Sequence, residues 1–241
     1  MQNNHRDVLY TKYHSSFNSL ISIADEKTLN RLYAHYDYKI YPIIKKFSSS
    51  ANILELGCGP GYLLQYLKSK GFNNCFGIDL SSEQIEIAKS KGNSVIQGDA
   101  IEFLKSNQKT YDVIFAFDFI EHFTKDELIE LSNLIYDSLN QGGIFIIRTP
   151  NGQGIFAGTV IYGDLTHQTI FTPNSLIQLL SQSGFKEVYC FENGPISKDL
   201  KGFIRKLFWG FFKFSLNIFR ISEVGGRINI LTQDFYAYSI K

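Results

Sequence analysis

The chain has 241 residues, of which 44% are hydrophobic and 20% are charged, and its formal net charge is +1 at pH 7. This length suits one α/β domain with additions and allows a sizeable core. Because basic and acidic residues nearly balance, the chain has no global basic field for nucleic acid, and we predict no nucleic-acid partner.

The cysteines and the N-terminus indicate the compartment. Cys58, Cys75 and Cys190 are widely spaced and form no C-x-x-C pair, which is typical of reduced core thiols. The polar first residues lack the apolar core of a signal peptide. We therefore expect a cytoplasmic protein.

Residues 1–50 form a predicted N-terminal helical cap. The pattern over residues 27–47 is largely helical, and three serines at 48–50 link it to the first strand. The segment is rich in tyrosine and histidine. These side chains either close over a ligand or pack against the sheet, and the sequence leaves both interpretations open.

A predicted strand runs directly into a glycine-rich turn at residues 53–61, which read Ile-Leu-Glu-Leu-Gly-Cys-Gly-Pro-Gly. A helix is expected over residues 62–70. Such a turn lets backbone N–H groups approach a ligand at the positive end of the helix. A dinucleotide fingerprint would need glycine at position 62, where Tyr62 stands, and no Gly-Lys-Ser/Thr of a phosphate-binding loop occurs. The alternative is an ordinary turn with incidental glycines.

Strands and helices alternate along the rest of the chain. Strands are predicted at 75–79, 94–100, 111–117, 143–148, 186–192 and 234–241, and helices at 82–91, 101–106, 125–140 and 173–183. This order predicts a parallel sheet with helices on both faces and a ligand crevice outside the carboxyl ends of the strands. Asp79 and Asp99 end the second and third strands. Asp79 can accept hydrogen bonds from ribose hydroxyls, although both residues can also be helix N-caps.

Residues 50–192 and the last strand resemble class I S-adenosylmethionine-dependent methyltransferases. The resemblance implies a doubly wound, seven-stranded, mostly parallel Rossmann-like α/β sheet, with the last strand inserted antiparallel between strands five and six. The methyltransferase domain would comprise residues 51–194 and 233–241. It also implies S-adenosylmethionine (SAM) as cofactor, bound by Glu55, Gly57, Cys58, Gly59, Gly61, Asp79, Leu80, Asp99, Ala100, Phe117 and Asp118.

A cluster of polar residues follows the fourth predicted strand. Asp118, Glu121 and His122 have the spacing i, i+3, i+4, so they share one face of a helical turn. His167 follows the fifth strand and would enter the same crevice. We predict catalytic roles for Glu121, His122 and His167.

This cluster resembles that of two metal-assisted O-methyltransferase groups, the ubiquinone-biosynthesis enzymes and those that methylate the 2′-hydroxyl at the ends of small RNAs. Both carry Glu-x-x-Glu-His here, where this chain has the shorter Asp118 first. Asp118, Glu121, His122 and His167 are thus candidate ligands for Mg²⁺, Mn²⁺ or Zn²⁺. In the alternative, His167 is a general base without metal and Asp118 only lines the cofactor pocket.

Residues 195–232 form a predicted helical insertion before the last strand. Its stretch 201–221 is rich in aromatic residues, and all of its charges are basic. The stretch is too charged to span a bilayer. It predicts either peripheral contact with an anionic membrane surface or a helix packed on the protein or on a second subunit.

Residues 150–173 resemble methyltransferases of bacterial surface-polysaccharide pathways. The expected acceptor is therefore a sugar hydroxyl of a surface glycan or lipid-linked saccharide, methylated at the inner face of the membrane. A small hydrophobic metabolite such as a quinone precursor is one alternative. A non-catalytic scaffold that retains the fold is another.

Overall fold

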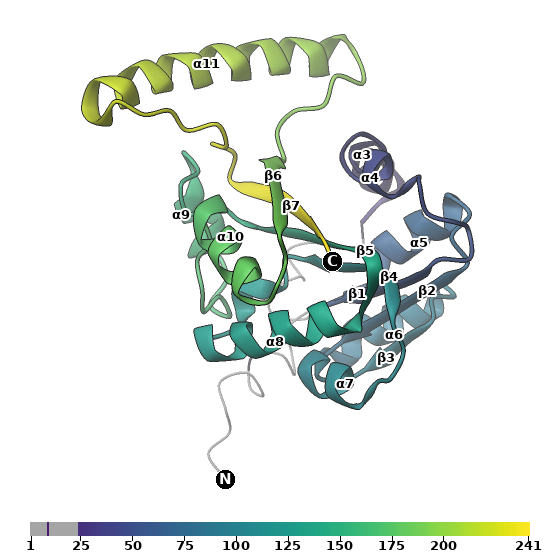
Figure 1. Ribbon diagram of the computed structural model, residues 1–241. Coiled ribbons are helices and arrows are strands. Elements are labelled where there is room, and N and C mark those ends of the chain that lie inside the picture. The colour runs from purple at the N-terminus through teal and green to yellow at the C-terminus, as the bar shows by residue number, and fades with distance from the viewer. Residues whose placement is uncertain (1–8, 10–23) are drawn as a thin grey trace.

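A computed structural model describes residue 9 and residues 24–241 (Figure 1). The rest of the predicted N-terminal cap, residues 1–8 and 10–23, lies outside the described part. A single seven-stranded sheet organises the chain from Asn52 onward. It has the order β3-β2-β1-β4-β5-β7-β6.

The strands follow the predicted sequence of elements. They are β1 (Asn52–Leu56), β2 (Asn74–Asp79), β3 (Val95–Gln97), β4 (Tyr111–Phe117), β5 (Leu139–Pro150), β6 (Glu187–Glu192) and β7 (Asp234–Ile240). Neighbouring strands from β3 to β5 pair in parallel, and β7 lies antiparallel between β5 and β6. The predicted doubly wound fold with an antiparallel last strand is confirmed.

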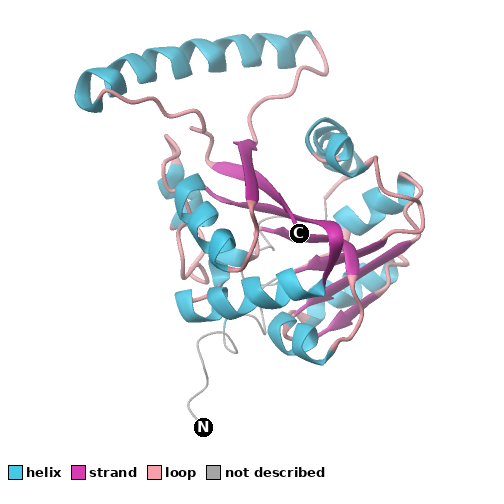
Figure 2. Ribbon diagram, in the orientation of Figure 1, coloured by secondary structure: helices cyan, strands magenta, loops and turns pink. Residues whose placement is uncertain are grey.

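Helices cover both faces of the sheet, as Figure 2 shows. Apolar residues of α3 (Glu26–Lys39), α4 (Tyr41–Ile44), α5 (Tyr62–Ser69) and α6 (Ser82–Ser90) form one buried cluster with one face of the sheet. Those of α7 (Ala100–Ser106), α8 (Lys125–Ser138) and α10 (Pro173–Gln182) form a second cluster with the other face. These two layers hold the carboxyl ends of the parallel strands in place.

The described part of the N-terminal segment packs on the sheet. Tyr36, Ile40 and Ile44 are buried against α5 and the central strands. The Tyr66 hydroxyl on α5 donates to Asp37 at 2.8 Å, which joins the segment to the domain. Residues 24–44 therefore pack against the sheet and contribute to its hydrophobic core.

Some boundaries differ from those predicted. The third strand is shorter than 94–100, because the Asp99 side chain caps α7 by accepting from the amides of Ile101 and Glu102. Helix α8 ends at Ser138 rather than at 140, and β5 begins at Leu139 rather than at 143. An irregularity in the pairing with β4 follows at this point. A 3₁₀ turn, η2 (Ile120–His122), and a short helix, α9 (Ala157–Ile161), were not predicted as such.

The insertion forms one helix, α11 (Leu200–Val224), which is three residues longer at its C-terminal end than the stretch 201–221. It lies at one end of the molecule beyond β6, β7 and α3 (Figure 1). None of its residues is buried. Among the described residues, no helix combines the length and apolar character needed to cross a bilayer.

Candidate functional site

A cavity of 280 Å³ lies at the carboxyl ends of β1, β2 and β4. Seven of the residues predicted to bind cofactor line it: Gly57, Gly59, Asp79, Leu80, Asp99, Ala100 and Asp118. Its wall also includes His122 from the polar cluster. The structure therefore places seven of the eleven predicted cofactor residues and one predicted catalytic residue around one space.

The glycine turn depends on backbone conformations that other residues rarely adopt. Gly57, Gly59 and Gly61 have φ angles of 68°, 50° and 74°. A Cβ at Gly57 would lie 2.5 Å from the Phe119 ring, and one at Gly61 would lie 2.3 Å from Asn93. A Cβ at Gly59 would meet no atom of residues 24–241 within 4 Å. Gly59 therefore presents bare backbone to the cavity, where a ligand can approach it closely.

Asp79 ties the glycine turn to the end of β2. One carboxylate oxygen accepts from the Gly59 amide and the other from the Ser81 amide, each at 2.8 Å. Burial raises the pKa of this carboxyl group, while the two amides oppose the rise. Asp99 lies across the cavity, and both of its capping bonds go to Oδ1. Asp79 and Asp99 thus both line the cavity, as the resemblance predicts for acids that contact the cofactor.

Four predicted cofactor residues lie outside the cavity lining: Glu55, Cys58, Gly61 and Phe117. Gly61 is the N-cap of α5, and Phe117 packs on Tyr36 and Tyr236. Burial, followed by the charges of Glu55 and Asp79, raises the pKa of the Cys58 thiol, so it is not a nucleophile at neutral pH.

Glu55 is buried in β1, below the glycine turn. It is 4% exposed, and its Oε2 atom has no hydrogen-bond partner among the described residues. Burial and the nearby charge of Asp79 raise the pKa of this carboxyl group well above its usual value. A buried carboxyl group of this kind gains free energy from a cationic neighbour. The amino and sulfonium groups of SAM are cationic, so Glu55, Asp79, Asp99 and the glycine turn fit that cofactor.

Asp118 pairs with Arg148 and does not join the Glu121 cluster. Register places Arg148 on β5 beside Phe117 on β4, so its guanidinium group reaches the next residue. Its Nη2 atom pairs with Asp118 Oδ2, and its Nε atom donates to Oδ1 at 3.0 Å. Asp118 has a φ of 48°, which turns the chain sharply after β4. Asp118 was predicted to be a metal ligand, but it forms an ion pair with Arg148 at the cavity wall and is not part of the cluster.

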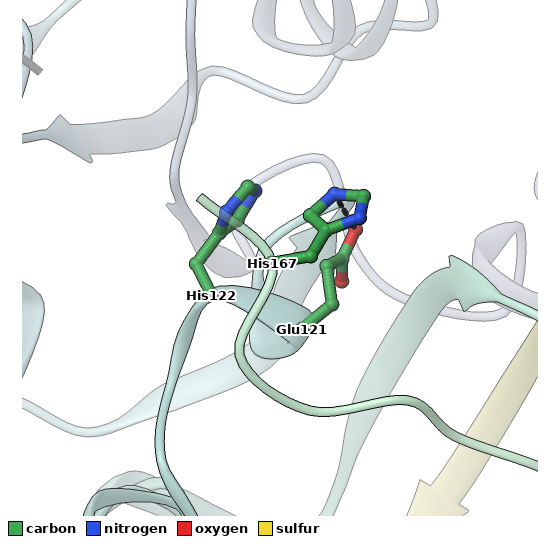
Figure 3. A group of neighbouring side chains, drawn as sticks. All are labelled: Glu121, His122 and His167. Carbon is green, nitrogen blue, oxygen red and sulfur yellow. Dashed lines mark ion pairs between the residues drawn. The ribbon is translucent and has the colours of Figure 1, made fainter. Parts of the chain in front are cut away.

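Glu121, His122 and His167 come together as predicted (Figure 3). Their ligand atoms all lie within 4.8 Å of one another. Glu121 Oε1 lies 4.0 Å from His167 Nε2, and the two imidazole ring centres are 4.9 Å apart. Glu121 and His122 belong to η2, and His167 lies in the loop between α9 and α10. The Gln168 and Thr169 amides donate to the Glu121 carbonyl at 2.8 and 3.0 Å, so the loop is fastened to η2.

Hydrogen bonds fix the orientation of both imidazoles. His167 Nδ1 lies 3.1 Å from the Ile161 carbonyl oxygen, which can only accept, so Nδ1 carries a proton. Thr166 Oγ1 donates to Asp164 at 2.6 Å and lies 2.9 Å from His122 Nδ1. Since the hydroxyl proton points to Asp164, His122 Nδ1 is also the donor. In the neutral form of each ring, Nε2 carries the lone pair.

The electrostatics of the cluster favour a cation at its centre. Burial raises the pKa of Glu121 well above its usual value, and the charge of Asp118 adds to this. Thr149 Oγ1 donates to Glu121 Oε2 at 3.0 Å, whereas Oε1 has no hydrogen-bond partner within the part of the chain that the structure describes. Burial and neighbouring His167 lower the pKa of His122, so that ring is neutral at pH 7. A neutral imidazole and a buried carboxyl oxygen can stabilise an imidazolium or a metal ion.

A second, larger cavity of 1210 Å³ lies between α3, α11 and the start of β7. Its wall carries both signs of charge, from Arg31 and Arg205 to Asp199 and Asp234, together with Trp209. Asp234 opens β7 opposite Pro150 at the carboxyl end of β5. This cavity therefore approaches the same edge of the sheet as the cofactor cavity.

Sequence reasoning missed several residues of the site. Phe119 and Phe123 line the cofactor cavity, and their ring centres are 4.9 Å apart. Their positions on either side of Glu121 and His122 in the sequence could have indicated that they belong to the site. Arg148 ended a predicted strand and Thr149 followed it, and no local pattern marks them as partners of Asp118 and Glu121.

Comparisons with known proteins also indicate a SAM-dependent methyltransferase. The methyltransferase domain family matches residues 33–189. A ubiquinone biosynthesis O-methyltransferase of Rickettsia canadensis is 32% identical over 199 residues, which cover 73% of this chain and 78% of that protein. A carboxy-S-adenosyl-L-methionine synthase of Campylobacter jejuni is 31% identical over 112 residues, or 44% of this chain and 46% of that protein.

Solved structures share the fold. A SAM-dependent methyltransferase from Archaeoglobus fulgidus superposes with a TM-score of 0.68 at 23% identity, covering 96% of this chain and 99% of that one. The magnesium protoporphyrin IX methyltransferase of Synechocystis with bound SAM gives 0.60 at 12% identity, covering 98% and 95%. The family match favours an enzyme over the scaffold alternative. With the glycine turn, Asp79 and Asp99 around one cavity, the chain belongs to the methyltransferase domain family and is a class I SAM-dependent methyltransferase.

Proposed function

We propose that this enzyme transfers the methyl group of SAM to a hydroxyl oxygen of its acceptor. The observation that carries the proposal is the Glu121–His122–His167 cluster, with His122 in the wall of the cofactor cavity. A hydroxyl is a weak nucleophile, so its attack needs a base or a metal at the reacting oxygen. An amine or thiolate acceptor would need this cluster less.

The chain's own residues can manage the proton of such an attack. The acceptor oxygen forms a bond to the methyl carbon as the carbon–sulfur bond breaks, and S-adenosylhomocysteine leaves with the bonding electron pair. The hydroxyl proton passes to His167 Nε2, because His167 Nδ1 is held as a donor by the Ile161 carbonyl. Glu121 Oε1, 4.0 Å away, stabilises the resulting imidazolium.

The same cluster can hold a divalent metal ion. Glu121, His122 and His167 would supply one carboxylate and two imidazole ligands, a set that suits Zn²⁺ and other divalent ions with an open position. When bound, the ion would lower the pKa of a ligated hydroxyl. The Ile161 carbonyl and Thr166 hydroxyl would orient the two rings from behind.

The acceptor we favour is a sugar hydroxyl of a bacterial surface glycan or lipid-linked saccharide. The 1210 Å³ cavity supports it, because its size and its mixture of charged and polar groups suit a saccharide better than a small apolar ring. Such an acceptor would be modified in the cytoplasm.

A quinone precursor is the second candidate acceptor. The ubiquinone biosynthesis O-methyltransferases of Rickettsia canadensis and Rickettsia typhi favour it, since the chain covers 78% and 76% of their lengths. A hydrophobic acceptor would also suit the Phe119–Phe123 wall of the cofactor cavity.

Methyl transfer from labelled SAM tests the proposal. Purified enzyme is incubated with lipid-linked saccharides or with catechol-type quinone precursors, and the products are treated with alkali, which cleaves methyl esters but not methyl ethers. Alkali-stable label in the saccharide supports the favoured acceptor, and alkali-stable label in the catechol alone supports the second. Label found only in esters or amines contradicts hydroxyl methylation.

A further inference from the structure

Helix α11 directs polar side chains toward the protein and apolar side chains outward, which is the reverse of an ordinary surface helix. The side chains that hold it to the protein are polar. Lys206 donates to the Tyr38 hydroxyl, Trp209 to Glu192, and Asn217 to the Ile228 carbonyl. Lys213 also donates to Glu192, at 2.9 Å. These positions recur every three or four residues, so they form the inner face of the helix.

The opposite face of α11 is apolar and exposed. At 100° per residue, six large apolar side chains lie in one stripe across from those contacts: Leu200, Ile204, Leu207, Phe211, Phe214 and Ile218. Each is between 43% and 75% exposed. No charged residue falls within this outer stripe. Soluble monomers rarely expose a continuous apolar surface along a helix of 25 residues, which is about 37 Å long.

Charge identifies the partner of the outer stripe. Leu200–Val224 contains five basic residues, Lys201, Arg205, Lys206, Lys213 and Arg220, against the single acid Glu223. Lys201 and Arg205 lie on the flank of the stripe, where they would meet lipid headgroups. An apolar face with basic flanks is the pattern of a helix that lies in the interface of an anionic bilayer.

We propose that α11 docks the enzyme flat on an anionic membrane surface, with the outer stripe inserted among the lipid acyl chains. This inference does not depend on the acceptor or on the chemistry of the site.

A second copy of the chain is a less favourable partner for the same face. A symmetric interface would join the two outer stripes and also bring their basic flanks together. Lys201 and Arg205, which flank the stripe on each helix, would then repel their counterparts on the other copy. An anionic bilayer attracts the same flanks.

Docking would place the larger cavity next to the membrane. Lys201, Arg205 and Trp209 of α11 line the 1210 Å³ cavity. An acceptor with a lipid anchor would then reach the cavity without leaving the bilayer.

Vesicle cosedimentation tests the proposal on the whole chain. The wild type is compared with Phe211→Glu/Phe214→Glu in the outer stripe and with Ile129→Glu/Ile177→Glu on α8 and α10. The control pair carries the same added charge at exposed apolar positions, 53% and 37% exposed, far from α11. Vesicles contain phosphatidylcholine alone or equal parts of phosphatidylcholine and phosphatidylglycerol. Binding of S-adenosylhomocysteine and the far-UV circular dichroism spectrum show that both variants are folded.

We expect the wild type and the α8/α10 variant to bind phosphatidylglycerol vesicles and to lose binding as salt rises. The α11 variant should bind at least about tenfold more weakly. Failure of the wild type to bind phosphatidylglycerol vesicles, or equal binding by all three proteins, would overturn the proposal. So would a wild-type dimer that the α11 substitutions dissociate and that shows no affinity for vesicles.

Discussion

At the residue scale, the glycines of the turn have different roles: Gly59 leaves space that a ligand can enter, and Gly61 avoids a clash within the fold. Gly59 and Gly61 both have positive φ, yet a side chain at Gly59 would point into open space and one at Gly61 would strike Asn93. The residues around the Glu121 cluster also have different roles. The Ile161 carbonyl and Asp164–Thr166 position the imidazoles, while Nε2 of His167 lies beside Glu121 Oε1.

Alanine at the two glycines should have different effects. Gly59→Ala should weaken binding of S-adenosylhomocysteine by about tenfold or more, with a stability loss of about 1–2 kcal/mol from the left-handed backbone. Gly61→Ala should lose more stability, because Asn93 and Ala88 must also move. Calorimetry and urea denaturation measure the two effects. Equal affinities at Gly59→Ala and wild type would show that no ligand approaches this backbone.

Removal of His167 should impair chemistry and spare the cofactor. His167→Ala should reduce kcat by roughly 10²- to 10⁴-fold, because the acceptor proton then has no positioned base. Steady-state kinetics with saturating SAM measures the change. Thr166→Val offers a comparison, since it should disturb only the orientation of His122 and cause a smaller loss. A His167→Ala enzyme with full turnover would rule out the proposed role.

At the element scale, local patterns were sufficient for most of the sheet. Alternation of apolar runs with capped helices predicted β1, β4, β7 and the helices on both faces, because each pattern reflects burial on a single element. The ends of β3 and β5 were mistaken, since capping by Asp99 and the pairing of Leu139 with Tyr111 decide them. The expected meeting of Glu121 and His122 with His167 is observed, but the helical face that was predicted to include Asp118 is not formed. Asp118 escaped that prediction because its partner, Arg148, depends on the register between β4 and β5.

The start of α8 depends on a reciprocal cap. Thr124 Oγ1 accepts from the Glu127 amide, and Glu127 Oε2 accepts from the Thr124 amide at 2.8 Å. Thr124→Ala should therefore lower the free energy of unfolding by about 1 kcal/mol in urea denaturation. Thr124→Ser keeps the hydroxyl and should lose much less. Equal losses in the two variants would assign the effect to the methyl group instead.

At the scale of the whole molecule, a largely buried histidine lies between the N-terminal helix and the last strand of the sheet. His35 of α3 stacks on Tyr236 of β7, with ring centres 6.0 Å apart. Burial lowers the pKa of His35 to about 4, and the charges of Lys39 and Arg148 contribute, although the neighbouring Asn193 side chain opposes them. The N-terminal helix is thus joined to the last strand by a histidine that resists protonation.

The free energy of unfolding should therefore decrease as the pH falls from the pKa of His35 in the unfolded chain to its lower pKa in the folded chain. The unfolded chain, with a histidine pKa near 6.5, binds more protons than the folded chain between pH 6.5 and about 4. The His35 contribution is present in full above pH 6.5 and is lost toward pH 4. Urea denaturation of wild type and His35→Gln should show a decline that is smaller in the variant by about 2 kcal/mol, after allowance for partial exposure. Parallel profiles would show that His35 does not titrate in this way.

Asp79 is expected to serve cofactor binding and His167 to serve chemistry, and one calorimetric experiment tests this division directly. S-adenosylhomocysteine is titrated into wild type, Asp79→Ala and His167→Ala. Asp79 holds the Gly59 and Ser81 amides and lines the cofactor cavity, so its loss should weaken affinity markedly, whereas His167→Ala should bind like wild type. Unchanged affinity in Asp79→Ala together with lost affinity in His167→Ala would contradict the assignment of the two sites.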